Sequence, residues 1–536
     1  MRTDKYGQQR DRHGIPPRTL LLYEILRNMN DSNGTSYSPT ESASMTRTNS
    51  LDTSTANTLP PDHPLRTLVL CFDGTGDQFD ADNSNIVEFF SMLKKDDPGK
   101  QLVYYQAGIG TYTTPQIATP LASKISKNLD MAVAWNLDAH IMGGYEFLMQ
   151  NYQVNDRICI FGFSRGAYTA RCLAGMIHKV GLLPACNHQQ VPFAYKMYTS
   201  ADDEGWKQSN AFKRTFSNAV DIEFLGVWDT VNAVGLIPRR LPFTTSNTVV
   251  KTFRHAVALD ERRAKFKANL WNRPTSNEEI LSVTDRKAQQ AGEKPKSHTG
   301  SHNNGKGTLR ALEHKYTKDK NAATNIDEVW FAGCHCDVGG GSVGNGVQTC
   351  LARIPLRWMV RECFRTNSGI LFHIDGLKKI GLDPSALYPV VLPRPPALPL
   401  DPSSTETSII QSIPKEEPPP IYDDDEMHID DLPQESEEML DLKDSLAPIY
   451  DQLNLAWFWW ILEYIPFRNR FQKSDNKWTT ESKMNRGHGR YIPRQQTRGV
   501  RIHRSVKTRM EAKHADGSVY KPKIENLDMS RVTWVD

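Results

Sequence analysis

Apolar and polar positions alternate along the chain in blocks that are typical of strands and helices in turn. The run RTLVLCFDGTG, which starts at Arg66, is a short apolar stretch ending in a glycine-containing turn, the pattern of a buried parallel strand. Runs of the same kind are QLVYYQAGIGT, RICIF, DIEFLGVWDTV and IDEVWFAGCH. Between them apolar residues recur at helical spacing, over residues 86–94, over 128–150 and after Ser164. Strands that alternate with helices predict a three-layer α/β fold around a mainly parallel sheet.

Long polar stretches interrupt this pattern and indicate the domain boundaries. Residues 1–63, rich in Ser, Thr and Asn in their second half, predict a disordered leader. The main domain then covers residues 64–390, with a polar surface loop at 285–309. Residues 391–440 are Pro-rich and then acidic, which predicts a disordered insert. We expect residues 441–536, an aromatic patch followed by a basic segment, to pack on the main domain.

Composition and charge narrow the classes of function. The chain has 536 residues and a formal net charge of +3, too close to neutral for a protein built mainly to neutralise nucleic-acid phosphates. Its eight cysteines are scattered singly apart from Cys334 and Cys336, which favours reduced thiols inside a cell. The N-terminus has no apolar signal core, and no apolar run is long enough to cross a bilayer. We therefore expect an intracellular, cytoplasmic protein with no nucleic-acid partner; the oligomeric state is not indicated.

The strongest chemical motif is Gly162-Phe163-Ser164-Arg165-Gly166. The G-x-S-x-G sequence is common by itself, but here an apolar strand precedes it and a helix rich in small residues follows. A nucleophilic serine on a sharp strand-to-helix turn needs glycine neighbours to avoid side-chain clashes, and the helix N-terminus favours developing negative charge. The motif predicts an α/β-hydrolase-like three-layer sandwich with Ser164 as nucleophile. A buried serine in an ordinary strand-to-helix turn is the alternative.

A serine nucleophile needs a base and an acid that orients the base. In α/β-hydrolases the order along the chain is serine, acid, histidine, each in a loop after a strand. Asp229 follows the apolar run in GVWDTV, and His335 follows the one in EVWFAGCHCDVGGG. We therefore predict Asp229 as the acid and His335 as the base.

Other residues could fill these two roles. His140, His178 and His255 lie in segments with helical spacing, where a histidine is more often a packed or capping residue. Asp337 is close to His335 in sequence, but neighbouring residues at a strand end diverge. We expect Asp337 to hold the glycine turn that follows it.

Two backbone amides are expected to bind the oxyanion, one after the nucleophile and one from an early loop. Arg165 supplies the first, and the turn that contains Gly74 and Thr75 is the natural source of the second. The Cys334-His335-Cys336 run could indicate zinc, but alternate residues of an extended segment point to opposite faces and no second ligand pair is present. We expect neither a metal nor a cofactor.

Five motifs in one order carry a resemblance to a known family: Phe72-Asp73-Gly74-Thr75, GFSRGAYTAR, GVWDTV, HAVALDERR and WFAGCHCDVGGG. Together they resemble the α/β-hydrolase catalytic domain of type VI secretion phospholipase effector-like proteins, a former domain of unknown function abundant in fungi. The resemblance covers residues 66–370, and the C-terminal WWILEYIP and IHRSV also look like fungal members. It implies a Ser-Asp-His esterase or phospholipase with Ser164, Asp229 and His335 as its triad. In many members the first motif continues into Trp-Asn, where this chain has Gly76-Asp77.

The sequence thus predicts a serine hydrolase that cleaves a carboxylic ester, of a lipid or phospholipid, through an acyl-enzyme. The alternative is a catalytically silent hydrolase-like scaffold or interaction protein. The aromatic stretch at 455–467 predicts a buried helix in preference to an interfacial patch. The basic residues Arg468, Arg470 and Lys473 would meet anionic lipid headgroups in a peripheral membrane contact, or pair with the acidic insert at 415–441.

Overall fold

The computed structural model describes residues 57–74, 77–108, 137–231, 241–271, 312–313, 323–400, 408–410, 435–472, 478–493 and 495–536. Of the leader expected at 1–63, residues 1–56 lie outside the described residues. The polar loop expected at 285–309 also lies outside them. Of the insert expected at 391–440, residues 401–407 and 411–434 also lie outside them.

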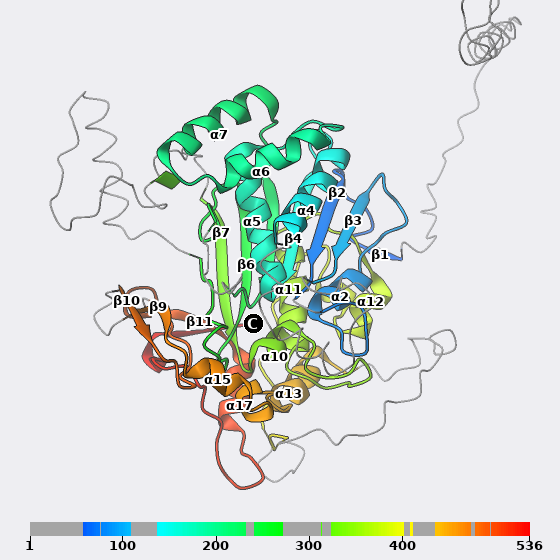
Figure 1. The fold of residues 1–536 in the computed structure, drawn as a ribbon. Helices are drawn as coiled ribbons and strands as arrows, with labels where there is room; N and C mark the ends of the chain where they lie inside the picture. Colours follow the sequence, from blue (N-terminus) through cyan, green and yellow to red (C-terminus); the bar gives the residue numbers. More distant parts are fainter. Residues whose placement is uncertain are drawn as a thin grey trace, which may run out of the picture. The chain divides into compact units, whose positions relative to one another are not determined.

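A parallel sheet forms the centre of the fold (Figure 1). Within the described residues it has eight strands in the order β12-β11-β7-β6-β5-β4-β2-β3, and every pairing in it is parallel. The strands are β2 (Thr67–Phe72), β3 (Gln101–Gln106), β4 (Arg157–Phe163), β5 (Ile222–Trp228), β6 (Val250–Ala258), β7 (Asn325–Phe331), β11 (Val500–His503) and β12 (Val532–Val535). The central strands are almost wholly buried, as their unbroken apolar runs require in a sheet covered on both faces.

Helices cover both faces of this sheet, which confirms the predicted three-layer α/β architecture. Alternate residues of a strand point to opposite faces. Leu68 and Leu70 of β2 pack with α4 (Leu137–Asn151), α5 (Ser164–Val180) and α6 (Val191–Thr199), whereas Val69 and Cys71 pack with α2 (Asn85–Ser91) and α11 (Arg353–Arg365). In Figure 1, α4, α5 and α6 lie together against one face, and α7 (Asp203–Phe216) lies beyond α6.

The order of strands reverses between β2 and β4. The chain enters the sheet at β2, adds β3 on one side and then β4 on the other. In open α/β sheets, ligands bind outside the carboxyl ends of the strands at such a reversal. Asp73 follows β2 and Ser164 follows β4, so the topology predicts a site between the turn after β2 and the start of α5.

The C-terminal residues complete the sheet. β11 pairs with β7 through Arg501 and Val329, and β12 pairs with β11. Ile502 is fully buried with apolar residues of β6 and β7. The segment at 441–536, which the sequence predicts to pack on the main domain, therefore supplies two strands of the same sheet.

Helix α13 (Glu437–Leu446) begins inside the stretch that the sequence predicts to be disordered. Ser436 caps it by accepting a hydrogen bond from the Met439 amide. Its carboxylates pair with arginines of α11: Asp441 and Asp444 lie 2.7 and 2.5 Å from Arg357. The acidic charge that predicts disorder in isolation is paired here with buried arginine, and residues 437–440 of this stretch form the start of a helix.

The aromatic stretch at 455–467 runs from the last residue of the short helix α14 (Gln452–Leu455) through the short helix α15 (Trp459–Glu463). The prediction that it is a buried helix is wrong. Leu455, Trp457, Ile461 and Tyr464 are 61%, 77%, 57% and 57% exposed. Within the stretch, the buried residue is the charged Glu463. Because these short helices bury only one side against the protein, the apolar side chains on the other side face solvent.

The other elements are short or peripheral. β1 (Thr58–Leu59) pairs with β8 (Phe372–His373), and β9 (Phe467–Gln472) pairs with β10 (Trp478–Lys483), both antiparallel. The remaining helices are α10 (His335–Gly339), α12 (Ile374–Lys379), α16 (Gln495–Arg498) and α17 (Arg504–Glu511). No helix within the described ranges is both long and apolar enough to cross a membrane.

Because β11 belongs to the central sheet, weakening it is expected to weaken the whole fold. Ile502→Ala removes a fully buried side chain and is expected to lower the free energy of unfolding by about 2–5 kcal/mol. Val519→Ala, at a C-terminal residue that is 46% exposed, is the control and is expected to change it by less than about 0.5 kcal/mol. Urea unfolding followed by tryptophan fluorescence measures both. A separate early transition for the C-terminal residues, with the main transition unmoved, would contradict the prediction.

Candidate active site

A strained turn joins β4 to α5. Ser164 is the first residue of α5 and has a φ of 58°, in the left-handed region that residues with a side chain rarely adopt. A Cβ on Gly162 would lie 2.6 Å from the carbonyl oxygen of Gly166, and one on Gly166 would lie 2.3 Å from that of Asp73. Gly162 is therefore required for the tight turn into the helix, and Gly166 is required for the helix to start this close to the end of β2.

The structure brings together the three residues that the sequence predicts as nucleophile, base and acid. Ser164 Oγ lies 2.7 Å from His335 Nε2, and His335 Nδ1 lies 2.5 Å from Asp229 Oδ2. The three follow β4, β5 and β7, so all are at the carboxyl edge of the sheet. With Nδ1 protonated, the neutral imidazole donates a hydrogen bond to Asp229 and accepts one from the Ser164 hydroxyl. Their exposures are 6% for Ser164, 3% for His335 and 0% for Asp229.

Both carboxylate oxygens of Asp229 accept two hydrogen bonds each. Its Oδ1 accepts hydrogen bonds from the Ala258 amide at 2.9 Å and from Arg490 Nη1 at 2.6 Å. Its Oδ2 accepts from His335 and from Arg490 Nη2, the latter at 2.8 Å. Burial alone would raise the pKa of Asp229, but the charge of Arg490 and the hydrogen bonds from His335 and Arg490 outweigh it and lower the pKa. Asp229 is therefore a carboxylate at neutral pH.

The His335 ring lies between two aromatic rings. The ring centroids of Phe163 and Phe266 are 4.8 and 4.9 Å from that of the imidazole. Burial lowers the pKa of His335, against the opposing effect of Asp229. The imidazole is therefore neutral in the resting site, the form that can accept a proton.

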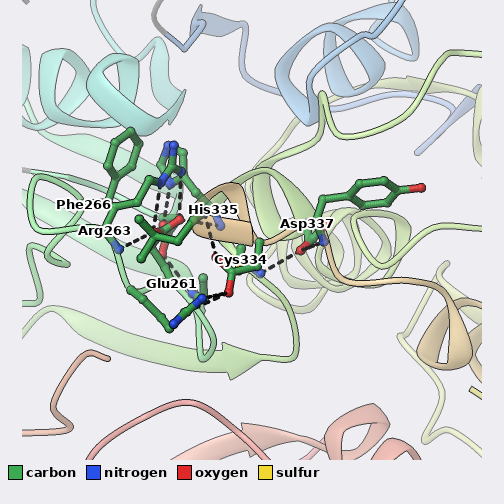
Figure 2. A network of polar contacts seen from close by, with 12 residues as sticks. Glu261, Arg263, Phe266, Cys334, His335 and Asp337 are labelled. Carbon is green, nitrogen blue, oxygen red and sulfur yellow. Dashed lines mark hydrogen bonds and ion pairs between the residues drawn. The ribbon is translucent and has the colours of Figure 1, made fainter. Parts of the chain in front are cut away.

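Helix α10 fixes the backbone of His335. Figure 2 shows Glu261 next to His335; its carboxylate accepts a hydrogen bond from the His335 amide at 3.2 Å. Glu261 also binds Arg263 through both oxygens. Burial alone would raise the pKa of Glu261, but the charge of Arg263 outweighs this and brings it to about 2. Asp337 accepts from the Cys334 amide at 2.8 Å and from the Tyr450 amide at 3.0 Å, so it holds the start of the helix.

Of the predicted oxyanion donors, Arg165 and Gly74 are described. Arg165 follows Ser164 in the first turn of α5, whose N-terminus faces the site. The Gly74 amide donates to the carboxylate of Asp73 at 2.8 Å. Thr75 lies outside the described residues.

The alternative bases have other partners. His255 lies in strand β6, where the sequence predicts a helix, because its apolar run is buried between two parallel strands. Its ring contacts Glu328 at 3.0 Å and accepts from the Thr230 amide. His178 stacks on Phe243 at 3.8 Å between centroids, and His140 is a buried residue of α4.

Cys334, His335 and Cys336 are the cap and first turn of α10, not an extended segment. Cys334 Sγ lies 3.4 Å from the carbonyl oxygen of Asp260. Within the part of the chain that the structure describes, no group of three or more His, Cys, Asp or Glu side chains is arranged to hold a metal ion.

Two residues that contact the predicted triad are missed by the sequence reasoning. Glu261 lies in the HAVALDERR motif, one of the five that carry the family resemblance, so that motif is the signal that could have pointed to it. Arg490 is one of many basic residues in the C-terminal segment, and nothing local distinguishes it. Its contact with Asp229 spans 261 positions of sequence and is visible only in the fold.

Comparison with known proteins gives a family and a relative. The family model described as "T6SS, Phospholipase effector Tle1-like, catalytic domain" matches residues 66–362. The uncharacterized protein YEL023C of Saccharomyces cerevisiae is 27% identical over 546 residues, which covers 83% of this chain and 79% of that protein.

Two solved structures are similar over part of the chain. An uncharacterized protein from Pseudomonas aeruginosa has 18% identity and a TM-score of 0.29, over 57% of this chain and 46% of that one. The Tle1 effector bound to the VgrG spike from the type 6 secretion system has 16% identity and a TM-score of 0.24, over 52% of each chain. The chain thus spans about half the length of these two, and at these TM-scores the likeness carries no argument.

The clearance at the turn before α5 gives a direct test of its geometry. Gly162→Ala adds a Cβ 2.6–2.7 Å from backbone atoms of Gly166 and Ala167, and is expected to cost about 1–3 kcal/mol of unfolding free energy. Gly344→Ala is the control, because its nearest neighbour would be 3.5 Å away. Thermal unfolding compares the two. Equal stability of both variants would show that the turn is not as tight as described.

Proposed function

The chain belongs to the family of type VI secretion Tle1-like phospholipase effector catalytic domains, which supports a lipid-hydrolase function, and from this premise we propose that it is a serine hydrolase. Its substrate is a carboxylic ester of a lipid or phospholipid. Ser164 is the nucleophile, His335 the general base and Asp229 the acid that orients the base.

One observation carries the proposal: the continuous hydrogen-bonded chain from Ser164 Oγ through His335 to Asp229, with contacts of 2.7 and 2.5 Å. A serine hydroxyl is a weak nucleophile unless a base within hydrogen-bonding reach takes its proton. A base is effective when a third group fixes its tautomer and ring orientation. Both conditions are met by the contacts of His335.

The proposed reaction has two halves. The Ser164 oxygen attacks the ester carbonyl carbon while His335 Nε2 takes the hydroxyl proton, and the carbonyl electrons move to oxygen. The tetrahedral intermediate collapses, the alcohol leaves with the proton from Nε2, and an ester of Ser164 remains. Water then attacks this acyl-enzyme with His335 again as base, which releases the carboxylic acid and restores the serine.

The oxyanion needs donors that are already aimed at it. The Arg165 amide, at the N-terminal turn of the 17-residue helix α5, is the first proposed donor. The second is proposed in the turn of Gly74 and Thr75. The Gly74 amide would first have to release Asp73, to which it now donates.

An exposed apolar face next to the site supports a lipid substrate. We define it by the exposed side chains Leu455, Trp457, Ile461 and Tyr464. It connects to the base through aromatic contacts, because Trp459 of α15 packs edge-on against Phe266 at 5.6 Å, and Phe266 packs against His335. Exposed apolar patches of this kind mark contact sites for membranes or partners, and a peripheral membrane contact is proposed here.

Labelling with a fluorophosphonate probe tests the nucleophile. The native chain is expected to be labelled, and Ser164→Ala and His335→Ala are expected to lose labelling and ester hydrolysis by about a thousandfold or more. Ser209→Ala, at a buried serine of α7, is the control and should be labelled like the native chain. Folded native protein that is neither labelled nor active on any ester would favour a catalytically silent scaffold.

The exposed apolar face predicts a difference between substrates. The double variant Trp457→Ser/Ile461→Ser is expected to lower hydrolysis of phospholipid in vesicles at least about tenfold, because burying even one large apolar side chain stabilises contact by about 1.5–3 kcal/mol. Hydrolysis of a soluble short-chain ester should stay unchanged. Val154→Ser, at an 84% exposed residue before β4, is the matched control. An equal loss on both substrates would mean that the face acts on the site and not on lipid.

A further inference from the structure

A buried arginine from the C-terminal segment grips the carboxylate of Asp229. Arg490 is 2% exposed, and its two terminal nitrogens lie 2.6 Å from Oδ1 and 2.8 Å from Oδ2. This is the two-pronged arrangement in which the guanidinium fixes both the position and the plane of a carboxylate. Arg490 lies outside residues 66–362, the part of the chain that matches the family.

The guanidinium itself is held in one orientation. Arg490 Nε donates to the carbonyl oxygen of Phe266 at 2.9 Å, and Nη1 donates to that of Ala258 at 3.1 Å. The backbone around it is anchored as well, because the Glu525 amide donates to the Arg490 carbonyl at 2.9 Å. The Arg490 side chain therefore cannot turn away from Asp229 without breaking several buried hydrogen bonds.

Charge balance explains why an arginine is needed there. Asp229 has no exposed surface, and a buried carboxylate without a counter-charge takes up a proton or draws one onto a neighbour. The neighbour is His335, whose imidazole would become the counter-ion and would then be unable to act as base. With Arg490 present, the resting pair of Asp229 and Arg490 is neutral and the imidazole stays unprotonated.

The other charged groups near the site have partners other than Asp229, although the charge of Arg263 also lowers the pKa of His335. Glu261 faces the amide of His335, and its carboxylate is paired with Arg263. Lys267 donates to the carbonyl oxygens of His488 and Gly489, and its pKa is lowered to about 8 by burial and by the charge of Arg490. Arg490 is the cation bonded to Asp229 among the described residues.

We propose that Arg490 is a positioning residue of the active site, which aims the Asp229 carboxylate at His335 and keeps the resting imidazole neutral. This inference rests on the proposed hydrolase function. It makes the C-terminal segment part of the site, because Arg490 binds the carboxylate of Asp229, which follows a central strand. A catalytic domain that ended near residue 390 would lack this contact.

The test compares Arg490→Lys and Arg490→Met on a soluble p-nitrophenyl ester across pH. Lysine keeps the charge but cannot bind both carboxylate oxygens of Asp229, so kcat is expected to fall about tenfold. The acidic limb of the kcat/KM profile is expected to stay at the same pH. Methionine removes the charge, so the limb is expected to move up by about one to two pH units, with activity recovering as the pH rises. KM should change little in both, because Arg490 does not face the substrate.

The matched control is Arg509→Met. Arg509 is also 2% exposed and C-terminal, but it binds the carbonyl oxygens of Ser445 and Ala447, away from Asp229. Its loss removes a buried arginine of the same kind and is expected to leave the acidic limb where it is. A limb that stays in place in Arg490→Met, or full activity in both Arg490 variants, would overturn the proposal.

A second measurement separates this proposal from the hydrolase function. The pKa of His335 is followed by NMR of histidine-labelled protein, with His335→Asn to assign the signal, and needs no turnover. It is expected to rise in Arg490→Met by the same one to two units, roughly. A native chain that is not labelled by fluorophosphonate would refute the hydrolase, whereas an unmoved His335 signal in a labelled chain would refute the role of Arg490. If Arg490→Met does not fold, Arg490→Gln takes its place.

Discussion

The carboxylate of Asp229 has no contact with solvent, and much of the structure is arranged around that constraint. A buried charge is tolerated when donors and a counter-charge surround it. Asp229 receives hydrogen bonds from the amide of Ala258, the last residue of β6, from His335 after β7 and from Arg490 in the C-terminal segment. Segments far apart in sequence therefore have to meet at one point, and the arrangement of the sheet brings them there.

Buried pairs of the same kind attach the rest of the C-terminal half. Arg357 and Arg361 of α11 bind carboxylates of α13, and Arg254 of β6 binds Glu362 at 2.5 Å. Such pairs add little net stability compared with apolar packing, but a wrong alignment leaves a charge unpaired and is costly. They are therefore suited to fixing how α13 and the strands after it join the sheet, which an apolar contact would specify less sharply.

The sequence predicts what is local and misses what is distant. Ser164, Asp229 and His335 each follow an apolar strand, so motif and strand together indicate them. β6 is missed because FRHAVALDERR mixes apolar and charged residues in a way that resembles a helix, although both faces of the strand are covered. Arg490 is missed because its partner is 261 positions away. The apolar residues at 455–467 predict burial by composition, but exposure depends on which side meets the protein.

The loop that contains Phe266 links helix α15 to the surroundings of Asp229. Glu463 of α15 accepts a hydrogen bond from the Ala264 amide at 2.6 Å, and Arg490 binds the carbonyl oxygen of Phe266. The Phe266 ring then packs against His335. Residues 264–266 thus contact α15 on one side and His335, the proposed base, on the other. Because Arg490 binds both this loop and Asp229, a shift of the loop that contacts α15 would also strain the contacts of the proposed acid.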